Sequence, residues 1–218
     1  FSGIEGRFRG SPVVNMETAS YLSGNGNNHL DAAFRWSHYM DELDWALSYF
    51  EGTDREPRLY KNADGTTLKP VYGQARQASL EIQYTISDWL LKAEVLSKHS
   101  DLNGNYWASV TGFEYTFANI HRGMDVGFLY EYLYDDRKEL AGSGLDNATF
   151  LGSRVALNDE NGFELLIGTI FDHQTGRMNN AFLESTRRIN ENWKWTLEGN
   201  FLVSPKSGSF LEQVKHDD

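Results

Sequence analysis

Large apolar residues occupy every second position along most of the chain after residue 28. Near the C-terminal end, Trp193, Trp195 and Leu197 alternate with Lys194 and Thr196. Because successive side chains of a β-strand point to opposite faces of a sheet, this period of two predicts a strand with one apolar and one polar face. No segment keeps a helical period long enough to compete. The pattern therefore predicts an all-β protein.

The alternation recurs in ten segments that pair into five hairpins. The paired segments are 30–36 with 43–49, 78–84 with 89–95, 111–117 with 124–134, 149–157 with 163–171, and 181–189 with 193–201. A period of two over this many segments predicts an antiparallel sheet.

The connections between these segments fall into two classes. Within the hairpins they are short, at 40–42, 86–88, 118–123, 158–161 and 190–192, whereas between hairpins they are longer and polar, at 51–73, 97–105, 135–146, 172–179 and 204–218. Short turns on one rim and long loops on the other are typical of transmembrane β-barrels of outer membranes. A soluble β-sandwich has no reason to sort its loops in this way.

The aromatic residues gather toward the two ends of the predicted strands. Trp36, Trp45, Tyr84, Trp89, Tyr115, Phe117, Phe163, Trp193 and Trp195 are close to the short turns, and Tyr49, Trp107, Tyr132, Tyr134, Phe171, Phe182 and Phe201 are close to the long loops. Two aromatic belts match the two interfaces of a membrane. The apolar face is therefore expected to contact lipid. The alternative is a soluble barrel with the aromatics inside, and the dense charge on the polar face argues against it.

The polar face is then expected to line a lumen. Its charged residues are Arg35, Asp44, Glu81, Lys92, Glu94, Glu114, Glu131, Arg154, Glu164, Glu184, Arg188, Lys194 and Glu198. If the second hairpin turns about residues 86–88, Glu81 falls opposite Lys92, which is a favourable cross-strand pair. The acidic excess predicts a weak cation preference for any pore. Alternatively, these charges only hold the wall together and hydrate a small interior.

Composition narrows the function further. The 218 residues carry a net charge of -11 and no cysteine. This charge argues against nucleic acid as a partner, because its binding depends on clustered Lys and Arg. Neither disulfides nor thiolate metal sites are possible. The longest apolar run, 165–171, is far shorter than the roughly 20 residues of a membrane helix.

The ends of the chain suggest a portion of a larger barrel. Residues 1–28 are expected to form a partial strand and a polar loop, and residues 29–218 to form barrel strands. Because an open sheet edge in lipid leaves backbone groups unpaired, further strands are expected before Phe1, and one more after Asp218.

Several segments resemble known proteins, namely 32–38, 47–59, 112–117, 131–137, 150–159 and 184–201. They are similar to uncharacterised porin-like outer-membrane proteins of Gram-negative proteobacteria, and the resemblance runs from residue 29 to 202. It implies an antiparallel transmembrane β-barrel in the outer membrane, in contact with lipopolysaccharide and phospholipid. It supplies no catalytic residue and no substrate.

Candidate chemistry is sparse. His99 and Ser100 suggest a lipid hydrolase, but adjacent residues of a strand point to opposite faces, and both are expected in a loop. Residues 62–65 and 101–105 have the Asn, Asp and Gly content of a calcium loop, which is also that of an ordinary turn. The six histidines are scattered. We therefore expect no enzyme activity, metal or cofactor.

The expected function is passive or facilitated passage of small solutes. The 51–73 loop either constricts the mouth or covers the rim. Large residues on the polar face, namely Phe50, Leu129, Leu133 and Leu166, leave open a second reading. In that reading the barrel is filled, and its long loops act as a receptor, adhesion or assembly surface. The pattern indicates no oligomeric state.

Overall fold

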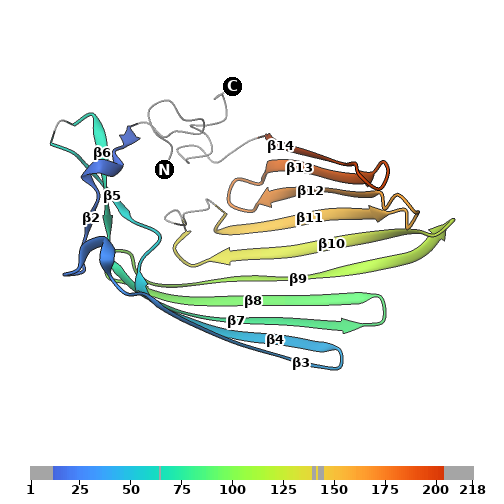
Figure 1. The fold of residues 1–218 in the computed structure, drawn as a ribbon, viewed down its shortest axis with the longest axis horizontal. Helices are drawn as coiled ribbons and strands as arrows, with labels where there is room; N and C mark the ends of the chain where they lie inside the picture. Colours follow the sequence, from blue (N-terminus) through green and yellow to red (C-terminus); the bar gives the residue numbers. More distant parts are fainter. Residues whose placement is uncertain (1–11, 64, 139–140, 142–144, 204–218) are drawn as a thin grey trace.

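The computed structural model describes residues 12–63, 65–138, 141 and 145–203 of the chain. In this part of the chain the regular elements are strands, apart from two short 3-10 helices, η1 (Met16–Thr18) and η2 (Gly26–Asn28). The strands form a ten-stranded antiparallel sheet and a second, smaller sheet (Figure 1). The prediction of an all-β chain with ten antiparallel strands is confirmed.

The large sheet is built from strands between residues 32 and 202. Its strands are β3 (Ala32–Met40), β4 (Leu43–Thr53), β7 (Gln74–Ile86), β8 (Trp89–Ser100), β9 (Gly104–His121), β10 (Met124–Asp135), β11 (Asn147–Ala156), β12 (Glu164–Asp172), β13 (Arg177–Arg188) and β14 (Lys194–Leu202). Their spatial order follows the sequence, and β3 and β14 are the two edges among the described residues.

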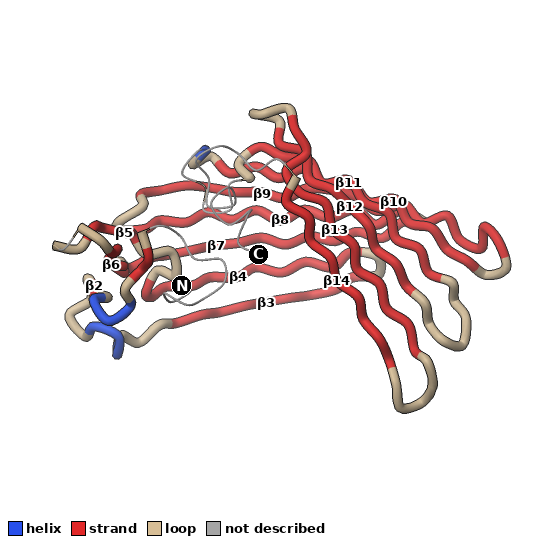
Figure 2. The backbone as a smooth tube through the Cα atoms, turned by 90° about the horizontal axis from the view of Figure 1, so that it is seen from above, coloured by secondary structure: helices blue, strands red, loops and turns tan. Residues whose placement is uncertain are grey.

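The sheet is strongly curved. Figure 1 shows its strands stacked in order from β3 to β14, and the view from above in Figure 2 shows that the sheet turns back beyond β9, so that β14 comes forward again. It therefore has a concave and a convex face. The connections within the five predicted hairpins all lie at the same rim.

Three of the five hairpins turn in two residues. Asp41, Ser87 and Arg122 adopt left-handed φ angles of 49°, 53° and 52°, and Gly123 follows Arg122 with a φ of 86°. Left-handed residues match the twist of the flanking strands in such tight turns. The other two connections, 157–163 and 189–193, are longer.

The predicted sorting of loops is only partly right. At the opposite rim, 54–73 and 136–146 are long, but the connections 101–103 and 173–176 are short. The error arose because β8 and β9 keep pairing through polar residues, with Lys98 opposite Tyr106 and Ser100 opposite Gly104. The backbone ladder does not require apolar side chains. Residues 204–218 lie outside the described part.

A small sheet occupies this second rim, at the left of Figure 1. It consists of β1 (Val13–Val14), β2 (Ser20–Tyr21), β5 (Arg58–Lys61) and β6 (Thr67–Tyr72). β6 pairs antiparallel with β5 and parallel with β1 and β2. The ring of Tyr21 stacks on Tyr72 at 5.0 Å. The 51–73 loop is thus partly a β-hairpin, which Pro70 and the lack of alternation concealed in the sequence.

The two faces of the large sheet differ in an unusual way. Its convex face exposes large apolar side chains, including Phe34 at 66%, Phe201 at 60% and Leu197 at 57%. The apolar side chains that are buried on this sheet, such as Leu129 and Phe150, lie on the other face together with the charges. This distribution is the reverse of that in a soluble protein, where the apolar face is covered.

Candidate functional site

The register of the sheet sorts the predicted site residues by face. Residues directly opposite each other on neighbouring strands project to the same side. The strand pairings place all thirteen predicted lumen residues on the concave face: Arg35, Asp44, Glu81, Lys92, Glu94, Glu114, Glu131, Arg154, Glu164, Glu184, Arg188, Lys194 and Glu198. Phe50, Leu129, Leu133 and Leu166 lie on this face too.

Seven of the aromatic residues predicted for the membrane interfaces, all near the short turns, lie on the opposite, convex face. They are Trp36, Trp45, Tyr84, Trp89, Tyr115, Phe117 and Trp195. Trp193 directly precedes β14 and is 68% exposed. Several of these rings touch one another, as Trp36 with Trp45 at 4.9 Å and Trp89 with Tyr115 at 4.7 Å between centroids.

Phe182 does not belong to the convex face, and its prediction as an interface aromatic is wrong. It has the same parity along β13 as Glu184, so its side chain lies among the charges. There it stacks on Phe150 with ring centroids 5.5 Å apart. Both rings lie over Gly168, where an added Cβ would come within 2.8 Å of each ring. Small residues and large rings thus fill the concave face between β11 and β13.

The predicted pairing of Glu81 with Lys92 is also wrong. The hairpin turns at Ser87 and Asp88, so that Ile86 pairs with Trp89, Glu81 lies opposite Glu94, and Gln83 lies opposite Lys92. Two carboxylates directly opposite each other repel. The register is set by the two-residue turn and not by these charges.

Arg35 compensates for this repulsion from two strands away. Its Nη2 donates to Glu81 Oε2 at 2.8 Å, its Nη1 makes a second, short contact with Oε1, and Nη1 also donates to Ser48 Oγ at 3.2 Å. The guanidinium can cross β4 because the intervening residues, Ser48 and Ala46, are small. A bidentate pair of this kind fixes the carboxylate in place.

Two hollows lie side by side on the concave face. One has a volume of about 450 Å³ and includes Arg35, Asp44 and Lys92 in its wall. The other has a volume of about 380 Å³ and includes Leu96, Val110 and Leu133. Both include Glu81 and Glu94, which therefore stand at the junction between a charged and an apolar compartment.

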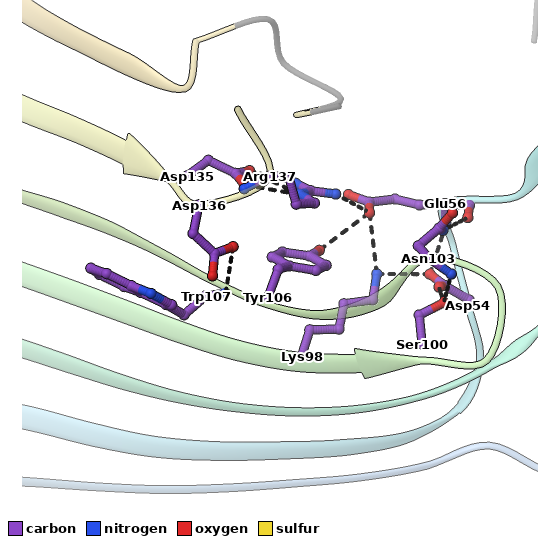
Figure 3. Close-up of polar contacts among 10 residues, drawn as sticks. All are labelled: Asp54, Glu56, Lys98, Ser100, Asn103, Tyr106, Trp107, Asp135, Asp136 and Arg137. Atoms are coloured by element: carbon purple, nitrogen blue, oxygen red, sulfur yellow. Dashed lines mark hydrogen bonds and ion pairs between the residues drawn. The ribbon is translucent and has the colours of Figure 1, made fainter. Parts of the chain in front are cut away.

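A second group of charges lies at the rim that carries the small sheet. Figure 3 shows side chains from three separate segments of the chain that point toward one another. We call Asp54, Glu56, Lys98, Ser100, Asn103, Tyr106, Asp135 and Arg137 the rim network. Lys98 Nζ lies 2.7 Å from Asp54 Oδ1 and 3.4 Å from Glu56 Oε2.

Arg137 completes the rim network from the β10–β11 connection. Its Nη1 lies 2.8 Å from Glu56 Oε2, and its Nη2 lies 2.6 Å from Asp135 Oδ2. The guanidinium also lies 3.7 Å from the centre of the Tyr106 ring, whose hydroxyl donates to Glu56 Oε2 at 3.2 Å. Glu56 thereby joins the beginning of the 51–73 loop to the 136–146 connection.

The carboxylate of Asp54 is held in its charged form. Its side chain is 1% exposed and that of Lys98 is 7% exposed. Burial raises the pKa of Asp54, but the ion pair with Lys98 and hydrogen bonds from Ser100 Oγ and Glu56 N outweigh burial and hold the pKa below its usual value. Burial lowers the pKa of Arg137, but its hydrogen bond to Asp135 and the nearby charge of Glu56 outweigh burial and hold that pKa above its usual value.

His99 and Ser100 do not form a catalytic pair. As expected from their adjacency, they lie on opposite faces, but in strand β8 and not in a loop. His99 Nδ1 contacts Asn105 on the convex side, while Ser100 donates to buried Asp54. In the sequence, the polar residues of 97–105 are the only sign of the rim network. Its other members cannot be recognised there, because Glu56 is 42 residues from Lys98 and 81 residues from Arg137.

Within the described residues, no group of three or more His, Asp or Glu side chains is placed to hold a metal ion. Asp64, part of one calcium-like stretch, lies outside that part of the chain. Over the same residues, no helix is both long and apolar enough to cross a membrane. Compared with known proteins, the chain matches no family model, no curated protein and no solved structure.

Proposed function

We propose that this chain forms the wall of a transmembrane β-barrel that lets small solutes pass through an outer membrane, with a weak preference for cations. The observation that carries the proposal is the reversed distribution of apolar surface. A convex face with Phe34, Leu197 and Phe201 more than half exposed is too extensive for a monomer in water. Lipid would cover such a face, and charges on the concave face would remain hydrated.

The dimensions of the apolar face support this setting. On β9 it extends from Trp107 to Phe117 and is bounded by Asn105 and Asn119. Ten residue steps cover about 34 Å along a strand, and at a tilt of about 40° they span roughly 26 Å of membrane. Aromatic pairs mark both ends, Trp107 with Tyr134 at 4.8 Å and Trp89 with Tyr115 at 4.7 Å.

Membrane insertion also requires hydrogen-bond partners for the outer edges of the two edge strands. Backbone groups without hydrogen bonds are costly in hydrocarbon. The proposal therefore includes pairing of β3 and β14 along their outer edges, either with each other or with further strands, so that the sheet closes. The concave face would then become a lumen lined by eight carboxylates and five bases of the predicted set.

The deciding experiment is single-channel conductance of the complete, refolded protein in a planar bilayer under a KCl gradient. Discrete current steps with a reversal potential toward that of K⁺ are expected. Glu94→Gln should move the reversal potential toward zero, whereas His99→Gln, on the convex face, should leave it unchanged. An anion-selective current would contradict the proposed role of the acidic wall.

A second candidate function is a closed barrel whose rim serves as a receptor, adhesion or assembly surface. Two observations favour it. Phe150 and Phe182 fill the concave face between β11 and β13, and the small sheet with the rim network forms an ordered surface at one end. A correctly inserted protein that carries no current would support this candidate over the channel.

A further inference from the structure

We propose that the 380 Å³ hollow between β7 and β10 binds an organic cation, namely an ammonium group attached to an apolar body. The inference rests on the proposed function to the extent that solutes must reach the concave face. The acidic excess of the whole face predicts only a preference for cations, whereas this inference specifies the chemical class of the solute. The hollow combines one apolar wall with one unpaired carboxylate.

The apolar wall comes from three neighbouring strands and one connection. Leu96 on β8, Ala108 and Val110 on β9, and Leu133 on β10 all project from the concave face, and Leu145 of the β10–β11 connection also lines the hollow. Gln77 and Ser79 add neutral polar groups on β7. A wall of this kind favours the aliphatic or aromatic body of a small ligand.

The carboxylates around the hollow are not equivalent. Glu81 is held by Arg35, and Asp135 is held by Arg137. Glu94 is exposed, faces Glu81 directly across the strand pair, and has no hydrogen bond or ion pair within the described residues; Arg35 acts on it only through a longer-range electrostatic interaction. It is therefore the carboxylate that can take a cation from a solute, and a bound cation would also relieve its repulsion with Glu81.

The positive charge of the ligand follows from the absence of bases in the described part of the hollow's wall. Among the described residues that line this hollow there is no Lys or Arg. Lys92, two residues from Glu94, borders the larger 450 Å³ hollow instead. The ammonium of Lys98 is occupied by Asp54 and Glu56. An anionic ligand would find no counter-ion there, whereas an ammonium finds Glu94.

The test uses phenethylamine, which is protonated at pH 7, as the probe. Ethylamine keeps the charge without the body, and 2-phenylethanol keeps the body without the charge. Equilibrium dialysis against the complete detergent-solubilised protein measures binding, and dialysis against the same detergent without protein subtracts partition into micelles. The control is Glu184→Gln, which removes a carboxylate from the same face outside the hollow.

We expect phenethylamine to bind more tightly than either fragment, and Glu94→Gln to weaken it about tenfold, as for loss of a charge-assisted hydrogen bond. Leu96→Ala should weaken phenethylamine but not ethylamine. Equal binding to wild type and Glu94→Gln would overturn the proposal. A K⁺ current that phenethylamine does not block would support the channel but contradict the binding site. Glu94-dependent binding without any current would support the binding site but contradict the channel.

Discussion

Lys98 and Asp54 show how much a single pair can matter at this rim. Both side chains are nearly inaccessible, and each is the closest charged partner of the other at 2.7 Å. Removing one member of a buried pair leaves an uncompensated charge, which costs far more than the pair contributes in total. The pair is therefore a sensitive point, although it is a weak source of net stability.

Replacing Lys98 by Met is expected to lower the free energy of unfolding by about 3 kcal/mol, because buried Asp54 loses its counter-ion. Urea unfolding of the refolded protein in vesicles measures this. The double variant Lys98→Met with Asp54→Asn should recover part of the loss. Arg76→Gln, which breaks an exposed pair with Glu51, should leave the unfolding midpoint unchanged. A similar effect of Lys98→Met and Arg76→Gln would contradict this reading.

Acid should weaken the rim network through Asp54. Its pKa is lower in the folded than in the unfolded protein. The unfolded state therefore binds the proton more readily, so this stabilisation is fully present above the unfolded pKa of about 4 and is lost as pH falls through the folded value. In unfolding series between pH 2 and 7, the stability difference between wild type and Asp54→Asn should shrink below about pH 4. If the stability difference between the two proteins does not change with pH, Asp54 is not the source of the acid sensitivity.

At the scale of elements, the alternation of side chains predicted more than the connections did. Trp193, Trp195 and Leu197 revealed β14 because a half-exposed strand must segregate its two faces. The small sheet was missed, since Pro70 and its neighbours show no alternation. The closeness of Phe182 to a long loop suggests an interface aromatic, but its parity with Glu184 puts it on the concave face. The register at Glu81 depends on one residue in a turn, which the pattern does not determine.

Contacts between distant segments could not be predicted from the sequence. Glu56 meets Lys98 and Arg137 only because the strands between them fold into one sheet. Likewise, nothing in the spacing of Phe150 indicates that its ring lies over Gly152 and Gly168. The contact with Gly168 depends on the register of β11 with β12, which places Gly152 opposite Gly168.

That packing gives a prediction for β11. A Cβ at Gly152 would lie 2.5 Å from Phe150 Cζ and 3.2 Å from Ile167 O. Gly152→Ala should therefore destabilise the protein by about 1–3 kcal/mol, as overpacked sites do. With Phe150→Ala in the background, the same change should cost much less, which a double-mutant cycle detects. Gly24→Ala is the control, because a Cβ there meets nothing within 4 Å. Equal costs in both backgrounds would exclude the clash.

At the scale of the whole molecule, substitutions on the convex face can show whether this face is in contact with lipid or with water. Leu151 lies at the middle of β11 on that face and is 38% exposed. In water, an exposed Leu→Arg change is nearly neutral, but at the midplane of a bilayer it costs about 2–4 kcal/mol. We therefore expect Leu151→Arg to reduce stability in vesicles by that amount.

The matched control for Leu151→Arg is His99→Arg, at the end of the apolar band where the depth in a membrane is small. It should cost little under the same conditions. If both variants unfold like wild type in vesicles, the convex face is not in contact with lipid. If both lose stability equally, the effect does not depend on depth and has another origin.

The rim network also bears on the order in which the protein assembles. Its three segments meet at Glu56, which contacts one partner 42 residues away and another 81 residues away. The hairpins of β7 to β10 must already be in register before those partners are near each other, because closing such long loops first is entropically unfavourable. We therefore expect the rim segments 54–63 and 65–73 to order last during folding and to detach first during unfolding.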